Sequence, residues 1–128
     1  MQYAVPRRGL PGSASLRAWA RAAGAGAVTL RIVGAREGRE LNRRYRRRDY
    51  ATNVLSFSYG NTRGDIVLCH PVIAREARAQ RKILRAHYAH LVVHGVLHLR
   101  GHAHGERMEN HEIRVLRRFG FADPYTVK

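Results

Sequence analysis

The sequence is poor in cysteine, in lysine and in long apolar runs. Cys69 is its single cysteine, so no disulfide can form within the chain, and a reducing compartment is expected. The longest stretches without Asp, Glu, Lys or Arg include 22–30 and 86–99, which are shorter than the ~20 residues of a membrane-spanning helix. A signal peptide has an apolar run after its basic N-terminal residues, and no such run follows Arg7 and Arg8. These absences predict a soluble, cytoplasmic protein with no membrane partner.

Acidic residues are also scarce, which leaves the charge strongly one-sided. The chain has 24 Lys and Arg against 9 Asp and Glu, a formal net charge of +15, and all its cations except Lys82 and Lys128 are arginines. A domain this basic attracts polyanions, of which nucleic acid is the commonest, and guanidinium groups suit bidentate phosphate contacts. A basic proteome whose surface positions drift to arginine would give the same composition.

The densest positive run lies at 43–48, at the end of an expected helix, and its arginines are Arg43, Arg44, Arg46, Arg47 and Arg48. The dipole of a helix favours cations at its C-terminus and explains part of this run. Five exposed arginines exceed what that interaction needs, so we predict contacts with RNA phosphates. Tyr45, inside the run, is expected to point into the core.

A chain of 128 residues with 45% hydrophobic content is long enough for one core, which predicts a single domain over 1–128. Apolar, β-branched runs predict strands at 28–33, 53–58 and 64–69, the last two as a hairpin. Helices are expected from Ser13 (as N-cap), over 35–45, from His70, over 82–99 and over 106–119. The predicted fold is α+β, a single small mixed sheet of about four strands packed with about five helices.

Three histidines in a short stretch are the strongest functional signal. His94 and His98 are four residues apart, so on a helix both side chains project from one face. Gly101 can take the left-handed conformation that ends a helix, and the turn brings His104 toward the same point. Three nitrogen ligands with an open fourth position are typical of catalytic zinc. The stretch therefore predicts one zinc ion on His94, His98 and His104, and hydrolysis by a metal-bound water.

The alternative is a surface or core histidine that happens to repeat, because the chain has 8 histidines. Two features favour the metal. The spacing His-x3-His-x2-Gly-x2-His (His-x3-His-x5-His for the ligands alone) is that of the metzincin zinc site. In addition, 86–99 lacks charged residues, and burying a neutral imidazole there without a partner would be costly.

One residue expected of a zinc peptidase is absent. Such peptidases carry a glutamate directly after the first histidine as general base, and this position is Gly95. Peptide cleavage is therefore disfavoured, and Gly95 is expected to leave room for a neighbouring backbone or a substrate. Asp65 and Glu106 are candidate proton acceptors near the metal, although neither has a spacing that requires this role.

The remaining histidines receive weaker assignments. His102 is a rival third ligand, two residues before His104. His87 and His90 are expected either to support the ligands or to be satisfied within the helix. We expect His70 and His111 to be surface residues.

The stretch from His94 to Gly101, followed by His104, resembles the signature of the YbeY family of bacterial rRNA-maturation endoribonucleases. The resemblance runs in order from about Val28 to Tyr125 and is weak before that. It also includes Glu40-Leu41-Asn42, Tyr45-Arg46, Asp49, the segment 52–57, Gly64-Asp65-Ile66 and Asp123-Pro124-Tyr125.

This resemblance implies a metal-dependent domain with zinc on His94, His98 and His104, and cleavage that is specific for single-stranded RNA. It also implies maturation of the 3′ end of 16S rRNA, the small-subunit rRNA, and a part in ribosome quality control. Ribosomal or ribosome-assembly proteins would then be further partners. The family's arginine in the Tyr-Arg step corresponds to Arg46, which would face the substrate phosphate near the metal.

The sequence departs from the family pattern in three places. His102-Ala103 stand where the family usually has Tyr-Asp, Gly105 where an acidic residue is common, and Ala51 where a proline is usual. The missing aspartate removes a negative charge beside the metal, which bears on how the ligands are oriented. Two other functions stay open: a non-catalytic, ribosome-associated RNA-binding factor with a structural metal, and a divergent metalloprotease.

Overall fold

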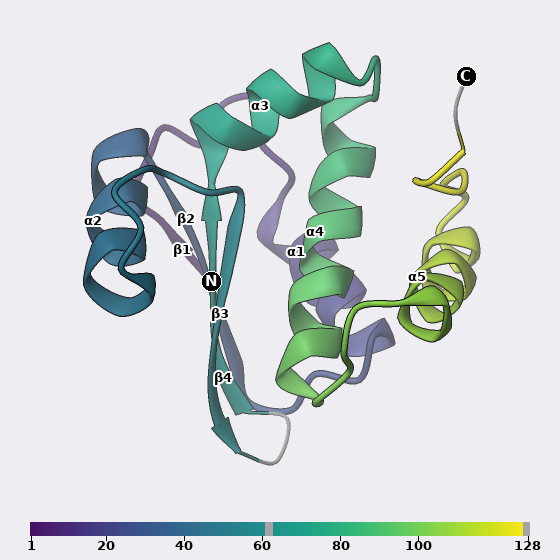
Figure 1. The fold of residues 1–128 in the computed structure, drawn as a ribbon. Coiled ribbons are helices and arrows are strands. Elements are labelled where there is room, and N and C mark those ends of the chain that lie inside the picture. Colours follow the sequence, from purple (N-terminus) through teal and green to yellow (C-terminus); the bar gives the residue numbers. More distant parts are fainter. Residues whose placement is uncertain (61–62, 127–128) are drawn as a thin grey trace.

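The computed structural model describes residues 1–60 and 63–126, which form four strands and five helices (Figure 1). This confirms the predicted α+β class, and β1 is the one strand that the sequence pattern did not indicate. The elements in chain order are β1 (Gln2–Tyr3), α1 (Ser13–Ala22), β2 (Val28–Val33), α2 (Ala35–Arg46), β3 (Val54–Gly60), β4 (Arg63–Cys69), α3 (His70–Ala79), α4 (Leu84–Leu99) and α5 (Glu106–Arg118).

The strands form one mixed sheet in the order β1-β2-β4-β3. β1 and β4 both run parallel to β2, with Leu30 of β2 opposite Ile66 of β4. β3 runs antiparallel to β4, as the predicted hairpin requires, with Leu55 opposite Val67. This order places β3 at an edge of the sheet.

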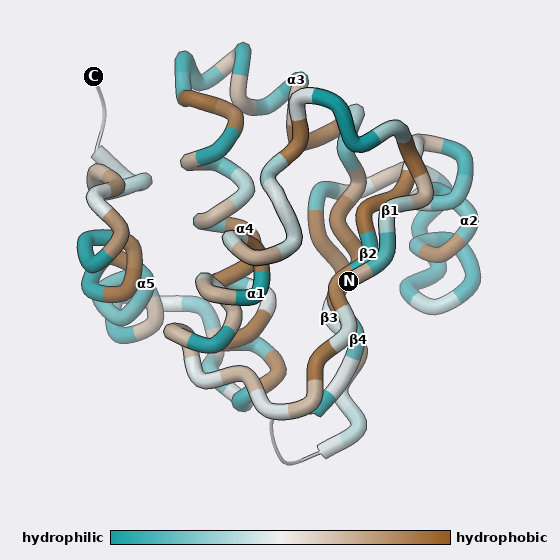
Figure 2. Tube along the Cα trace, turned by 180° about the vertical axis from the view of Figure 1, so that it is seen from behind, coloured by the Kyte–Doolittle hydropathy of each residue, from teal (hydrophilic) through white to brown (hydrophobic). Residues whose placement is uncertain are grey.

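Helices cover both faces of the sheet (Figure 1). On one face α2 packs through Leu41 against a small apolar cluster: Val33, Leu55, Val67, Cys69 and Val72. On the other face α1 and α4 cover Leu30, Ile32, Ile66 and Leu68, and α5 packs against α4. Figure 2 shows hydrophilic stretches along α2 and α5, which each expose one side to solvent.

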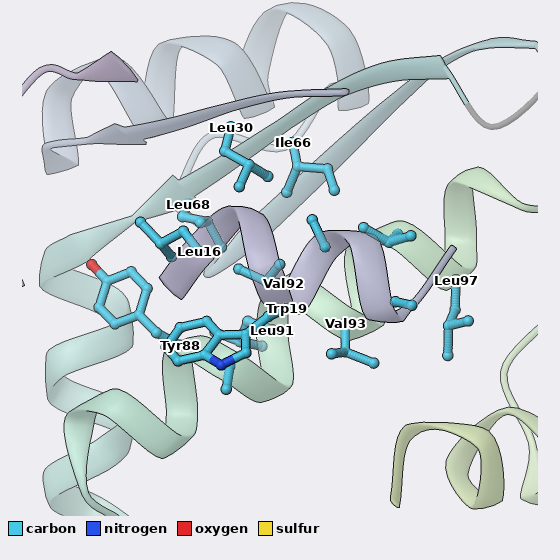
Figure 3. Packing of buried hydrophobic residues seen from close by; sticks show 14 of the residues in the cluster. Leu16, Trp19, Leu30, Ile66, Leu68, Tyr88, Leu91, Val92, Val93 and Leu97 are labelled. Atoms are coloured by element: carbon cyan, nitrogen blue, oxygen red, sulfur yellow. The ribbon is translucent and has the colours of Figure 1, made fainter. Parts of the chain in front are cut away.

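α4 is the central helix of the fold. It is apolar around most of its circumference because the sheet, α1 and α5 all pack against it. Figure 3 shows Leu16 and Trp19 of α1, Tyr88 and Val92 of α4 and the sheet residue Leu68 within one apolar cluster. Among the described helices, α4 included, none has the length and apolarity needed to cross a membrane. A helix enclosed in this way holds its side chains in fixed positions.

α4 comes very close to the sheet at Gly95. A Cβ atom at this position would lie 3.1 Å from Ser56 Oγ and 3.2 Å from Ile66 Cγ2. The Ser56 hydroxyl also donates a hydrogen bond to the Gly95 carbonyl at 3.1 Å. The expectation that Gly95 makes room for a backbone or a substrate was wrong, because side chains of the sheet fill the space.

Gly95→Glu, which restores the peptidase pattern, is expected to destabilise the protein and to give no peptidase. The new side chain would be forced between α4 and the sheet, at a cost of about 3 kcal/mol or more from overpacking and charge burial. Thermal unfolding measures the effect. Gly12→Glu, at an exposed glycine with no atom near its Cβ position, is the matched control. An unchanged melting temperature for Gly95→Glu would contradict this account of the helix–sheet contact.

Two local expectations were wrong. Ser13 does not cap α1: the cap position is Gly12, which has no side chain, and the Ser13 hydroxyl instead accepts a hydrogen bond from Arg17. Tyr45 is 55% exposed rather than part of the core. Its ring meets Phe57 edge-on at 5.4 Å, because the last turn of α2 lies beside the edge strand and is not enclosed by other elements.

Candidate metal centre

Three imidazoles converge at the C-terminal end of α4. His94 and His98 come from successive turns of the helix, and their Nε2 atoms are 3.1 Å apart. His104 comes from the loop after α4, which turns at Gly101 with φ 86°. The ring of His104 lies 4.4 Å from that of His98 and 5.1 Å from that of His94. The structure therefore brings together the three histidines that the spacing singled out.

The donor set fits a zinc ion. One ligand nitrogen from each of these histidines lies within 4.8 Å of the others. Tetrahedral zinc with bonds of about 2.0–2.1 Å places two nitrogens roughly 3.3 Å apart, close to the observed His94–His98 separation. Burial, and then the neighbouring imidazoles, lower the pKa of His98. Its imidazole is thereby kept neutral, which is the form that binds metal.

A buried carboxylate holds His94 from behind. Glu112 of α5 is 0% exposed, and one of its oxygens lies 3.2 Å from His94 Nδ1 and 2.8 Å from His90 Nε2. The Tyr125 hydroxyl donates to the other oxygen at 2.7 Å. Burial alone would raise the pKa of Glu112, but the hydrogen bonds from His90, His94 and Tyr125 outweigh it and lower the pKa to about 2. Glu112 is therefore ionised and accepts the Nδ1–H of His94, which leaves His94 Nε2 free for a metal.

His90, His94 and Glu112 also lie close enough together to hold a cation. The two groups share His94 but use different nitrogens, because Nδ1 faces Glu112 while Nε2 faces His98. We interpret Glu112 and His90 as support for one ion at His94, His98 and His104. Glu112 was not predicted from the sequence, because it lies 18 residues beyond His94 in no recognised spacing and only the packing of α5 on α4 brings it there.

Glu112→Gln is expected to weaken zinc binding about 10- to 100-fold, because the amide can no longer act as a charged acceptor for His94. Competition with a chromophoric chelator measures the affinity. Glu106→Gln, at an exposed carboxylate that starts the same helix, should leave the affinity unchanged. Equal zinc affinity in the Glu112→Gln variant and the parent protein would rule out the orienting role.

The other histidines lie elsewhere. His102, the rival ligand, has its ring 5.4 Å from that of His111 and is not part of the three-histidine group. His87 is buried and its Nε2 pairs with Glu76 at 2.9 Å, whereas its Nδ1 has no hydrogen-bond partner among the described residues. His70 was expected on the surface, but it is partly buried, with Nδ1 2.8 Å from the Tyr88 hydroxyl, because the start of α3 packs on α4.

The two candidate proton acceptors are also away from the imidazoles. Asp65 accepts a hydrogen bond from Tyr59 on the β3–β4 hairpin, and Glu106 is exposed at the start of α5. Neither belongs to a described group of side chains that could hold a metal.

Arg46 faces the same cavity as the three histidines. This cavity of about 530 Å3, here called the arginine cavity, is lined by Arg46, Ser56, Ser58, His94, His98, His104, Asn53, Val54, Leu55 and Leu99. Arg46 donates a hydrogen bond to the Ser56 carbonyl at 2.7 Å, and its guanidinium lies over the Phe57 ring at 5.2 Å. It therefore reaches across the edge strand from α2 toward the histidines.

The other four arginines of the run do not line this cavity. Arg43 and Arg44 both approach Glu40, at 2.8 Å and 3.6 Å. Arg47 ends α2 in the left-handed conformation with φ 57°, and Arg48 follows it on the exposed loop. Their side chains could contact RNA only outside the arginine cavity.

A second cavity of about 440 Å3 adjoins the centre on its other side. It lies among α3, α4, α5 and the segment after α5, and it shares Asn53, Val54, His94 and His104 with the arginine cavity. The candidate metal centre thus borders two cavities.

Fold and site together define a class: an α+β protein in which three convergent imidazoles and an arginine line one cavity. Residues 14–120 match the family described as Endoribonuclease YbeY. The chain belongs to this family, which confirms the resemblance found in the sequence.

Curated relatives of the same name match over most of their lengths. The Endoribonuclease YbeY of Stenotrophomonas maltophilia strain R551-3 is 48% identical, covering 98% of this chain and 91% of its own. The relative from Aromatoleum aromaticum is 54% identical and covers 90% of this chain and 81% of its own length. The relative from Bordetella pertussis is 52% identical and covers 98% of this chain and 93% of its own length. The fold is similar to the solution structure of a Thermotoga maritima protein, with a TM-score of 0.58 at 23% identity over 98% of this chain and 97% of the other.

Proposed function

We propose that this protein is a zinc-dependent endoribonuclease that cleaves single-stranded RNA, in the maturation of the 3′ end of 16S rRNA and in ribosome quality control. The observation that carries the proposal is the arginine cavity, where one arginine side chain and three imidazoles face the same space. Membership of the YbeY endoribonuclease family supports the choice of RNA, as does the net charge of +15.

In this proposal each residue of the cavity has a defined task. His94, His98 and His104 would hold one zinc ion, and zinc in such a site supplies a water-derived nucleophile at neutral pH. Arg46 would bind the scissile phosphate and stabilise the charge that builds up on it. Glu112 would keep His94 in the tautomer that leaves Nε2 free. The arginines at 43, 44, 47 and 48 would contact RNA farther from the cleaved bond.

We further propose that residues 1–128 work as one domain in the cytoplasm, with small-subunit rRNA as partner and ribosomal or assembly proteins as further contacts. The larger apolar cluster supports this, since it joins α1, the sheet, α4 and α5. The arginine-rich surface suits rRNA, which is dense in phosphate.

The divergent metalloprotease is disfavoured by the packing at Gly95. The glutamate that such enzymes need would collide with Ser56 and Ile66, and Arg46 already occupies the Ser56 carbonyl on the edge strand. A non-catalytic factor would bind RNA without cleaving it, because its metal would have only a structural role.

Cleavage of a short single-stranded RNA by the zinc-loaded protein is expected to stop when a chelator removes the metal and to return when zinc is restored. Gel analysis of end-labelled RNA measures it, with the same sequence in a duplex as the matched substrate. Binding without cleavage of either substrate, at full zinc occupancy, would favour the non-catalytic factor. Cleavage that persists after metal removal would overturn the zinc-dependent function.

A further inference from the structure

The second cavity is unlike the arginine cavity in charge. Three of the chain's 9 acidic residues, Glu76, Glu109 and Glu112, line it together with one cation, Lys82. Among the described residues that line the arginine cavity there is no carboxylate. We therefore call the second hollow the acidic cavity. A phosphate is attracted to the arginine side and repelled on the acidic side, so what enters the acidic cavity is an uncharged group rich in hydrogen-bond donors.

Glu76 is held ready to accept such donors. Its Oε1 atom takes hydrogen bonds from Asn53 Nδ2 at 3.0 Å and from His87 Nε2 at 2.9 Å. Oε2 has a single longer contact, 3.3 Å from Asn53. The Glu76 side chain is 31% exposed, whereas that of His87 is 4% exposed. The carboxylate is thus fixed from behind by its partners and remains open toward the cavity.

The opposite kind of group is also present. Lys82 donates one N–H to the Pro124 carbonyl at 2.8 Å, and an ammonium has two further donors. Tyr125 and His90 meet edge-to-face, with ring centroids 5.2 Å apart, and give the cavity an aromatic wall. A carboxylate, an ammonium and an aromatic wall in one hollow match the edge and the face of a nucleobase.

The size and position suit a single nucleotide. A volume of about 440 Å3 is within the usual range for small-molecule sites. His87, which holds Glu76, and His94, which belongs to the metal centre, are seven residues apart on α4, or about 10 Å along the helix axis. That separation is comparable with the reach of a nucleotide from its phosphate to the far edge of its base.

We propose that the acidic cavity binds the base of the nucleotide next to the cleaved phosphodiester, and that it prefers a base with an exocyclic amino group. This inference rests on the proposed function. Cytosine donates its N4 amino group to a carboxylate, and uracil carries a carbonyl oxygen at the corresponding position, which a carboxylate repels. The site would make cleavage depend on the base although the metal centre and Arg46 contact only the phosphate.

Binding of CMP and UMP to the zinc-loaded protein tests the inference, because the two nucleotides differ in the base and share the phosphate. Isothermal titration calorimetry is expected to give CMP at least about 5-fold tighter binding than UMP, as one base-specific contact predicts. Glu76→Gln should remove most of this ratio, because an amide can donate to uracil as well as accept from cytosine. Glu37→Gln, on α2 across the sheet and in neither cavity, should keep the ratio.

A second variant guards against misfolding of Glu76→Gln. Lys82→Met should weaken CMP and UMP alike, because both bases carry the O2 carbonyl that the ammonium would contact. Equal affinity for CMP and UMP in the parent protein, or an unchanged ratio in a folded Glu76→Gln variant, would overturn the base site. Uniform cleavage at C and U would also overturn it while leaving the endoribonuclease intact. CMP selectivity with no RNA cleavage would contradict the proposed function and retain the site.

Discussion

His98→Ala is expected to lose both stoichiometric zinc and RNA cleavage. His98 is the central histidine of the group, with its ring centroid 4.5 Å from that of His94 and 4.4 Å from that of His104. Without it only two imidazoles remain, one of them on an exposed loop, and two nitrogen ligands do not make a stable zinc site. Zinc per chain should fall from one to near zero by mass spectrometry of the metal. The rate of cleavage of single-stranded RNA should fall below detection.

His102→Ala is the matched control, because it removes another imidazole of the same segment whose ring lies near His111. This variant should keep one zinc per chain and most of its activity. Zinc loss in His102→Ala together with retention in the variant lacking His98 would show that the rival ligand is the true one.

Arg46→Ala is expected to keep its zinc and to cleave RNA about 10²- to 10³-fold more slowly. The guanidinium lines the cavity of the three histidines, so its loss removes the charge that in our proposal binds the scissile phosphate, while all three histidines remain. Single-turnover cleavage rates and zinc content, measured on the same preparation, separate the two effects. Arg46→Lys should recover part of the rate, since an ammonium supplies charge but not the bidentate geometry.

Arg39→Ala provides the control for overall charge, because Arg39 of α2 pairs with Asp49 in the following loop and lines neither cavity. Its cleavage rate should stay within a few-fold of the parent protein. A rate for Arg46→Ala that matches Arg39→Ala would remove Arg46 from the reaction and would favour the non-catalytic alternative.

The features that the sequence predicted correctly depend on local chain geometry. A spacing of four residues puts His94 and His98 on one helix face in any fold, and the turn at Gly101 needs only its own backbone freedom. The antiparallel pairing of β3 with β4 likewise follows from two apolar runs that lie close together in the sequence. Such patterns are independent of what packs around them.

The features that the sequence missed depend on which elements meet. Glu112 reads as an ordinary helical glutamate until α5 packs on α4 and places it beside His90 and His94. Tyr45 follows the apolar period of α2 but lies where the sheet ends, so it stays exposed. β1 has only two residues, too few to show any alternation. The acidic cavity is lined by residues of α3, α4, α5 and the segment after α5, so no local sequence pattern predicts it.

The position of β3 at the rim of the sheet has a bearing on solution behaviour. A strand with an unpaired side is a template onto which a strand of another molecule can add. Arg46 covers part of this rim by donating to the Ser56 carbonyl, and a positive charge there repels an equally basic copy of the chain. RNA lying in the same groove would shield the rim further. The proposed RNA-binding surface therefore includes the unpaired edge of β3, and we expect a preparation freed of RNA to be the one to keep dilute.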